Sequence, residues 1–170
     1  MSSSAPTALP KILVSACLLG NRVRYDGEAL TLEDAILARW LAAGQVVSVC
    51  PEVEGGLPVP RPPAEIVGGA AVKVLAAEAQ VIDNNDEDVS GYFVSGAKRA
   101  LSLCQRHSIS VAVLTEGSPS CGSSAVYDGT FSRNRIPGQG VTTALLRSRG
   151  ITVFSQYELA AADRVLNSNY

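Results

Sequence analysis

KILVSACLLG, residues 11–20, begins with branched and small residues that show no regular polar alternation, and it reaches a cysteine as the run ends. Such a short apolar run is typical of a parallel strand that is covered on both faces. The arrangement occurs twice more, as QVVSVC at residues 45–50 and as ISVAVLTEGSPSC at residues 109–121. Three predicted strands therefore end at, or shortly before, a cysteine: Cys17, Cys50 and Cys121.

Helical patterns separate these strands along the chain. Apolar residues recur at helical spacing in four segments, which are residues 31–44, 88–107, 140–150 and 157–166. A fourth buried strand is predicted at residues 151–155. Strands that alternate with helices predict an α/β fold. We expect a Rossmann-like, doubly wound and mostly parallel sheet with helices on both faces. Residues 1–10 are predicted to be a flexible N-terminal segment, and residues 11–170 a single domain.

Two further stretches are less regular. Residues 51–69 contain five prolines and four glycines, and this composition predicts an irregular connection. The runs AVKVL (residues 71–75) and AQVIDN (residues 79–84) predict a small antiparallel hairpin. Thr31 is the predicted cap of the first helix, and Asp88 or Ser90 the predicted cap of the second.

Composition narrows the class of protein. The chain has 170 residues, of which 46% are hydrophobic, but its apolar runs fall far short of the roughly 20 residues that span a bilayer. We therefore expect a cytoplasmic protein that does not enter a membrane. The net charge of −2 provides no general basic field, so a nucleic-acid partner is disfavoured. Four cysteines without an export signal indicate reduced thiols with metal or catalytic roles.

The strand-end cysteines are predicted to share one site. Parallel strands end at the same edge of a sheet, and ligands bind in the crevice there. Cys104 differs, because it lies on the apolar stripe of a predicted helix and is expected to be a buried packing residue. Three thiolates suit an iron–sulfur cluster with one open iron better than a closed zinc site, which takes four ligands. Zinc, or three unrelated cysteines, are the open alternatives.

Four segments resemble the DUF523 family, whose characterised members include thiouracil desulfidase, a small bacterial iron–sulfur enzyme. They are SACLLGNRVRYDG (15–27), VCPEVEGGLPVPRPPAEI (49–66), TEGSPSCGSSAVYDGTFS (115–132) and GQGVTTALLRSRGI (138–151). The likeness runs from about residue 11 to residue 154. It implies that Cys17, Cys50 and Cys121 hold a [4Fe-4S] cluster whose fourth iron is free to accept sulfur. It also implies that the catalytic carboxylate is Glu52 and the catalytic serine Ser118.

The resemblance implies removal of sulfur from thiolated uracil, giving uracil and sulfide, with a small thiolated pyrimidine as the partner. Such chemistry needs an acceptor for the sulfur, an attacking water and a proton donor for the ring nitrogen. A sulfurtransferase, a non-catalytic cluster-binding or metal-binding module, and a desulfidase that acts on a thiolated nucleoside or tRNA are the alternatives. The oligomeric state is left open.

Two further residues are candidate substrate-binding groups. Asp26 follows the first cysteine loop, although Asp-Gly is also a turn signal. Arg61, together with Glu65, either forms a wall of the pocket or pins the proline-rich loop through a salt bridge. We favour the pinning role.

Overall fold

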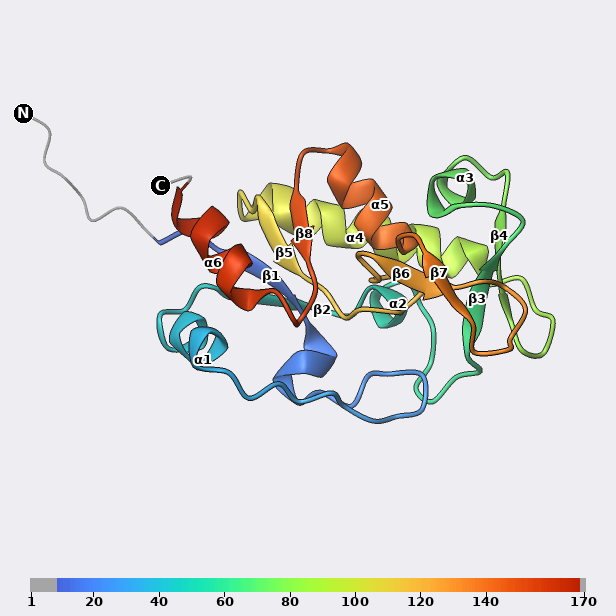
Figure 1. Cartoon of the computed structure of the whole chain (residues 1–170), viewed down its shortest axis with the longest axis horizontal. Helices are drawn as coiled ribbons and strands as arrows, with labels where there is room; N and C mark the ends of the chain where they lie inside the picture. Colours follow the sequence, from blue (N-terminus) through green and yellow to red (C-terminus); the bar gives the residue numbers. More distant parts are fainter. Residues whose placement is uncertain (1–8, 169–170) are drawn as a thin grey trace, which may run out of the picture.

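A parallel sheet of four strands forms the centre of the structure, which is a computed structural model that describes residues 9–168. Most of the predicted N-terminal segment, residues 1–8, lies outside the described residues. The strand order is β2-β1-β5-β8, and every neighbouring pair is parallel (Figure 1). The strands are β1 (Ile12–Ser15), β2 (Val46–Val49), β5 (Val111–Val113) and β8 (Thr152–Phe154). The predicted α/β class and the four predicted strands are confirmed.

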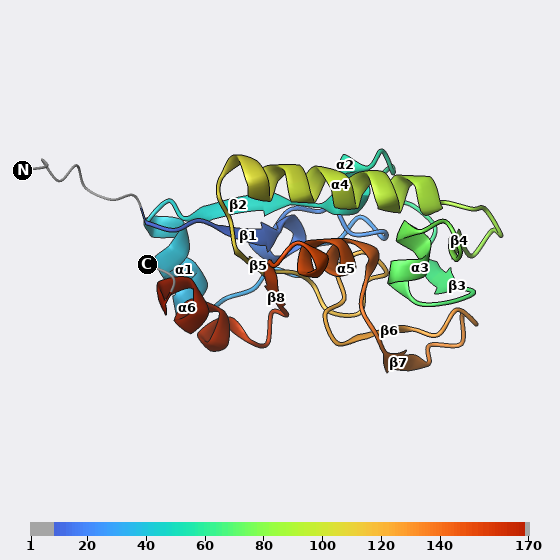
Figure 2. The ribbon, with the colours of Figure 1, turned by 90° about the horizontal axis from the view of Figure 1, so that it is seen from above.

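Helices cover both faces of this sheet (Figure 2). One face packs against α1 (Ala35–Ala42) and α6 (Leu159–Ser168), and the other against α4 (Ser90–Arg106) and α5 (Val141–Ser148). Side chains along β1 alternate between the two cores because successive residues of a strand point to opposite faces. Ile12 packs with Trp40 of α1, whereas Leu13 packs with Leu101 of α4. The sheet is therefore doubly wound, as predicted.

The first helix starts later than its sequence predicts. Asp34, rather than Thr31, is the N-cap, and its Oδ1 accepts a hydrogen bond of 2.7 Å from the amide of Ile36. Asp163 of α6 accepts a 2.9 Å hydrogen bond from the indole Nε1 of Trp40, which ties the two helices of this face together. At α4 the N-cap is Val89, and Asp88 instead accepts a hydrogen bond from the amide of Ser90.

The predicted hairpin is wrong in one of its two strands. Residues 71–75 form a short helix, α3 (Ala71–Leu75), and β4 (Gln80–Asp83) pairs instead with β3 (Ala64–Val67). β3 lies within the stretch predicted to be irregular, and it begins directly after the last proline of that stretch, Pro63. Proline removes a ladder donor, so the strand forms only where the prolines end.

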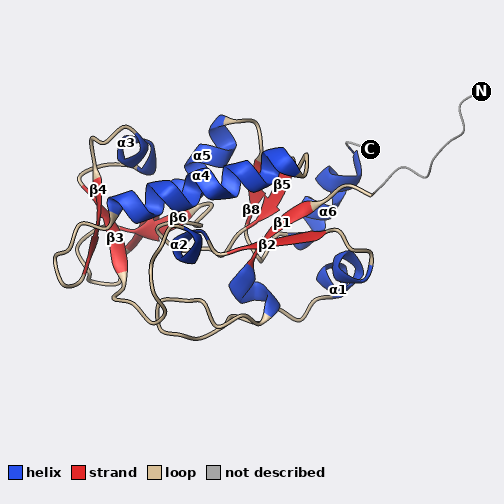
Figure 3. Cartoon of the chain, turned by 180° about the vertical axis from the view of Figure 1, so that it is seen from behind, coloured by secondary structure: helices blue, strands red, loops and turns tan. Residues whose placement is uncertain are grey.

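A third apolar cluster stabilises this β3–β4 hairpin. Ile66, Val74 and Val81 pack there against Phe93 and Ala97 in the first half of α4. The second half of α4 packs on the parallel sheet, so one long helix supports both layers (Figure 3). A further antiparallel hairpin, β6 (Ala125–Tyr127) with β7 (Arg135–Pro137), was not predicted. No helix within residues 9–168 is both long and apolar enough to cross a membrane.

Candidate active site

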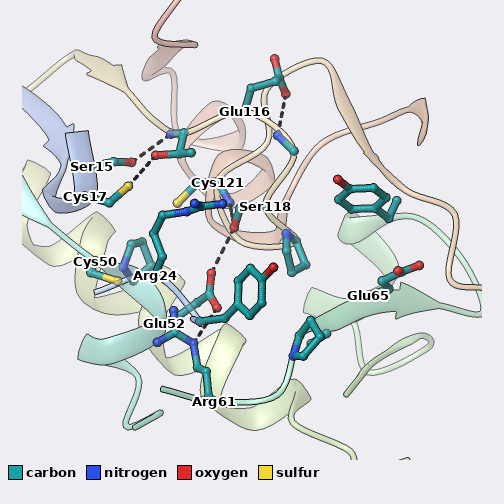
Figure 4. Close-up of a pocket in the computed structure, with 18 of the residues that line it drawn as sticks. Ser15, Cys17, Arg24, Cys50, Glu52, Arg61, Glu65, Glu116, Ser118 and Cys121 are labelled. Atoms are coloured by element: carbon teal, nitrogen blue, oxygen red, sulfur yellow. Dashed lines mark hydrogen bonds and ion pairs between the residues drawn. The ribbon is translucent and has the colours of Figure 1, made fainter. Parts of the chain in front are cut away.

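The carboxyl ends of β1, β2 and β5 open into one cavity. Cys17 lies in the short helix η1 (Ala16–Leu19) after β1, and Cys50 lies between β2 and the helix α2 (Pro51–Glu54). Cys121 lies in the loop that follows β5. All three cysteines line a cavity of about 610 Å³ (Figure 4). The predicted convergence of these three cysteines is therefore observed. Cys104 belongs to α4, is buried in the core that this helix shares with the sheet, and does not line this cavity.

The three cavity thiols are electrostatic neighbours. Burial raises the pKa of each, and for Cys121 the negative charges of Glu52, Cys50 and Cys17 raise the pKa further. The pKa of the Cys104 thiol rises to about 11 through burial alone. Buried thiols that repel one another as thiolates become ligands when a cation is bound among them.

No group of three or more His, Cys, Asp or Glu side chains within the described part of the chain could hold a single metal ion. The cysteines of an iron–sulfur cluster bind different iron atoms, so they need to line one cavity rather than meet at one point. All four cysteines are free thiols. Three of them, Cys17, Cys50 and Cys121, are thus available to a cluster in this cavity.

Glu52 and Ser118 meet beside the cysteines. Oε2 of Glu52 accepts a hydrogen bond of 3.1 Å from Oγ of Ser118. The Ser118 oxygen in turn accepts hydrogen bonds from the amides of Ser120, at 3.0 Å, and Cys121, at 3.2 Å. The serine therefore connects the carboxylate to the loop that carries the third thiol (Figure 4).

Arg61 pins the proline-rich loop, which is the favoured role, but its acidic partner is Glu52 rather than Glu65, and both Arg61 and Glu65 also line the cavity. Nε of Arg61 donates to Oε1 of Glu52 over 3.1 Å, and the side chain is almost completely buried. The guanidinium also donates to the carbonyl oxygens of Pro58, at 3.1 Å, and Val23, at 3.0 Å. Arg61 thereby joins two loops and orients the carboxylate of Glu52.

Glu65 and Asp26 have other partners. Oε1 of Glu65 accepts hydrogen bonds from the amides of Gly129, at 2.9 Å, and Phe131, at 3.2 Å, and so holds the loop between β6 and β7. Asp26 does not line the cavity. Its Oδ1 accepts a 3.0 Å hydrogen bond from the amide of Glu28, which is the turn role that its Asp-Gly sequence also indicated.

Glu116 was not singled out in the sequence, yet it organises the loop of Ser118 and Cys121. Its Oε1 accepts hydrogen bonds from four backbone amides, and its Oε2 accepts from two hydroxyls. The donors are the amides of Gly117, Ser123, Ser124 and Ala125 and the hydroxyls of Ser123 and Ser124. Burial raises the pKa of this carboxyl, but the hydrogen bonds outweigh burial and lower the pKa to about 2. The one local signal is an acid at the junction of a buried strand and a Gly/Ser-rich loop.

A family model described as 2-thiouracil desulfurase matches residues 12–158 of the chain. The chain belongs to the 2-thiouracil desulfurase family. A curated relative, the uncharacterized protein YbbK of Bacillus subtilis (strain 168), is 41% identical over 148 residues, which are 87% of this chain and 97% of that protein. A solved structure titled [4Fe-4S]-dependent thiouracil desulfidase TudS (DUF523Vcz) is 45% identical with a TM-score of 0.85, and the match covers 93% of this chain and 98% of that one. The resemblance seen in the sequence is confirmed.

The mouth of the cavity in this member of the 2-thiouracil desulfurase family is aromatic and basic. The ring of Tyr25 lies 5.9 Å from the guanidinium carbon of Arg24, and the ring of Tyr127 lies 5.3 Å from that of Arg135. Arg133 lines the same cavity. Within residues 9–168, Arg133 and Arg135 form no ion pair with a carboxylate. Flat rings beside cationic groups are suited to an anionic heterocyclic ligand.

Proposed function

We propose that this chain is a [4Fe-4S]-dependent desulfidase that converts a thiolated uracil into uracil and sulfide. One observation carries the proposal: Cys17, Cys50 and Cys121 line the same cavity as the paired side chains of Glu52 and Ser118. Membership of the 2-thiouracil desulfurase family, and the likeness to a solved [4Fe-4S]-dependent thiouracil desulfidase, support the same reading.

The donor set fits the cluster. Three free cysteines offer soft thiolate ligands, and soft thiolates favour iron–sulfur clusters over hard cations. Cys17, Cys50 and Cys121 would therefore hold the cluster. When bound, it supplies a Lewis-acidic iron without a protein ligand, which polarises the C=S bond and accepts the sulfur.

Glu52 is the proton-transfer group. Its carboxylate is held by Arg61 at Oε1 and by Ser118 at Oε2, so it is an oriented group for proton transfer. It takes a proton from the water that attacks the carbon, passes it to the ring nitrogen as charge builds on the heterocycle, and takes it back when the new carbonyl group forms. Overall, water provides the oxygen of the new carbonyl group, and its two protons leave with the sulfur as hydrogen sulfide.

Ser118 orients that base. Its oxygen accepts from the amides of Ser120 and Cys121, so its single proton is directed to Glu52. The apolar and proline residues of the cavity wall, which include Val23, Pro63 and Pro119, limit the access of bulk water to the reacting carbon.

The cavity mouth favours a second substrate candidate, a thiolated pyrimidine that carries a phosphate. Arg133 and Arg135 are exposed residues of the cavity lining, where a phosphate attached to the base would lie, and arginine binds phosphate through charge-assisted hydrogen bonds. A free base has no group for these cations. We expect kcat/KM to be higher for thiouridine 5′-phosphate than for thiouracil, and Arg135→Gln to reduce that preference.

The test is anaerobic reconstitution with iron and sulfide, followed by incubation with 2-thiouracil, 4-thiouracil, their nucleosides and nucleotides, and a thiolated RNA oligonucleotide. Uracil or its nucleotide, formed in equal amounts with free sulfide, is the expected result. A thiolated acceptor in place of free sulfide would instead identify a sulfurtransferase. A stable cluster with no product from any of these compounds would identify a cluster-binding module and overturn the proposal.

The proposal includes three predictions from the sequence, on the location of the protein, its partner and its domain organisation. The protein works in the cytoplasm, a small thiolated pyrimidine rather than a nucleic acid is its partner, and residues 11–170 act as one domain. The RNA oligonucleotide in the substrate series tests the second of these, because desulfuration of that compound would contradict it.

A further inference from the structure

We propose that Thr115 is a positioning residue that donates a hydrogen bond to the Cys17 thiolate and thereby raises the reduction potential of the cluster. The inference rests on the proposed function, since it concerns the cluster that Cys17 helps to hold. It adds a residue that acts on the cluster through one of the cluster's ligands.

The contact joins the ends of two neighbouring strands. Oγ1 of Thr115 lies 2.9 Å from Sγ of Cys17, and both residues are buried and line the cavity. Thr115 follows β5 and Cys17 follows β1, and these two strands pair in parallel. The sheet register therefore sets the separation of the two groups.

The backbone of Thr115 is held independently. Its amide donates a hydrogen bond of 3.0 Å to Oγ of Ser15, the last residue of β1. Ser15 is 3% exposed and Thr115 is 8% exposed, so water does not replace these contacts. The hydroxyl of Thr115 is thus kept at the sulfur by a second interaction that does not involve the sulfur.

Coordination decides the direction of the hydrogen bond. In the free thiol either atom can donate, but a cysteine bound to iron is a thiolate and has no proton to give. Thr115 must then donate and Cys17 must accept. Within the described residues, Thr115 Oγ1 has no other side-chain partner that would compete for its proton.

Cys50 has a different environment. Its Sγ lies 3.7 Å from the carbonyl oxygen of Val23, which is an acceptor, and its hydrogen-bond donor is the backbone amide of Val53 rather than a hydroxyl. The two cysteine ligands that follow β1 and β2 therefore have different hydrogen-bond partners. Of these two, Cys17 is the one with a hydroxyl group beside its sulfur. A hydrogen bond to a ligand sulfur stabilises negative charge on the cluster, so it favours the reduced state and raises the potential.

The experiment uses the reconstituted full-length protein with Thr115→Val, which keeps the shape of threonine but removes the hydroxyl. Thr115→Ser restores the hydroxyl. Thr152→Val is the matched control, because it is the same change at an exposed position of β8. Three quantities are measured: iron and sulfide content, the midpoint potential followed by EPR, and the coupling of an exchangeable proton in the ENDOR spectrum of the reduced cluster.

Thr115→Val is expected to have a more negative midpoint potential and to lose one exchangeable-proton coupling, while Thr115→Ser and Thr152→Val keep the wild-type values. A wild-type potential and spectrum in Thr115→Val would overturn the inference and leave the proposed function standing. If Thr115→Val holds no iron, Thr115→Ala is measured instead, and a wild-type potential there overturns the inference equally. Wild-type protein without a four-iron cluster would overturn the proposed function itself.

Discussion

Ser118 donates a hydrogen bond to Glu52 over 3.1 Å, although 66 residues separate the two in the chain. The contact forms because α2, which contains Glu52, follows β2, and the Ser118 loop follows β5, on the same edge of the sheet. Arg61 binds the other oxygen of the carboxylate. The proton-transfer group is thus oriented from two sides before any substrate enters.

Loss of either member of this pair should lower turnover without loss of the cluster. We expect Glu52→Gln and Ser118→Ala each to reduce kcat by roughly 10²–10⁴-fold, which is the usual contribution of a positioned proton-transfer group. The measurement is uracil formation together with iron content. Glu54→Gln is the control, because Glu54 is an exposed acid of the same short helix. Normal turnover in Glu52→Gln would exclude the proposed role.

The three cavity cysteines should differ from the fourth in cluster binding. Cys17→Ala, Cys50→Ala and Cys121→Ala are each expected to lose most of the bound iron after anaerobic reconstitution. Cys104→Ala should keep a full cluster and lose about 1 kcal/mol of stability, because it leaves a small cavity in the core around α4. Iron and sulfide analysis checks this prediction, and full iron content in any of the first three variants would contradict it.

Glu116 should stabilise the fold in a pH-dependent way. Its folded pKa of about 2 lies below the ordinary 4.5, so its contribution is complete above about pH 4.5 and disappears as the pH falls towards 2. We expect Glu116→Gln to cost about 1–2 kcal/mol at pH 7, near the lower end for hydrogen bonds to a charged group, because solvent reaches the carboxylate.

Urea unfolding of the apoprotein at pH 7, 4 and 3 measures this difference. The gap between wild type and Glu116→Gln should narrow as the pH falls. Glu33→Gln, at an exposed position before α1, serves as the control and should show no such trend. A gap that stays constant from pH 7 to pH 3 would show that the carboxylate charge is not what holds the loop.

The contact between α2 and α4 should tolerate no side chain at Gly96. A Cβ there would overlap the carbonyl oxygen of Pro51, so α2 and its Glu52 would have to move. Alanine improves helix propensity by about 1 kcal/mol, but we expect a net loss of at least about 2 kcal/mol from overpacking against backbone, and lower turnover.

Gly91 is the matched control for this substitution. It lies in the same helix, and a Cβ there meets nothing within 4 Å. Gly91→Ala should therefore stabilise the protein by about 0.5–1 kcal/mol and leave turnover unchanged. Thermal unfolding of both variants measures the contrast, and equal behaviour of the two would contradict the backbone contact.

The parallel sheet could be predicted because its signals are local. Each strand is a short apolar run, each helix has its own periodicity, and the helix-strand alternation indicates the layers. The β3–β4 hairpin could not be predicted in the same way. AVKVL at residues 71–75 has strand-like composition but forms α3, because β4 pairs with residues 64–67 and the side chains of Ala71, Val74 and Leu75 pack on α4 and α5. Tertiary packing overrides local propensity in such short runs.

The sequence by itself determined that three cysteines stand at strand ends, because strand periodicity and the common direction of parallel strands bring those ends to one edge. Only the tertiary structure decided what surrounds them. Arg61 binds Glu52 instead of Glu65, the hydroxyl of Thr115 contacts the sulfur of Cys17, and Glu116 accepts hydrogen bonds from the loop that contains Ser118. Each of these contacts joins loops, or the ends of separate strands, whose sequences have no periodicity. Their pairing depends on how the packed sheet places their backbones, and no local pattern encodes that placement.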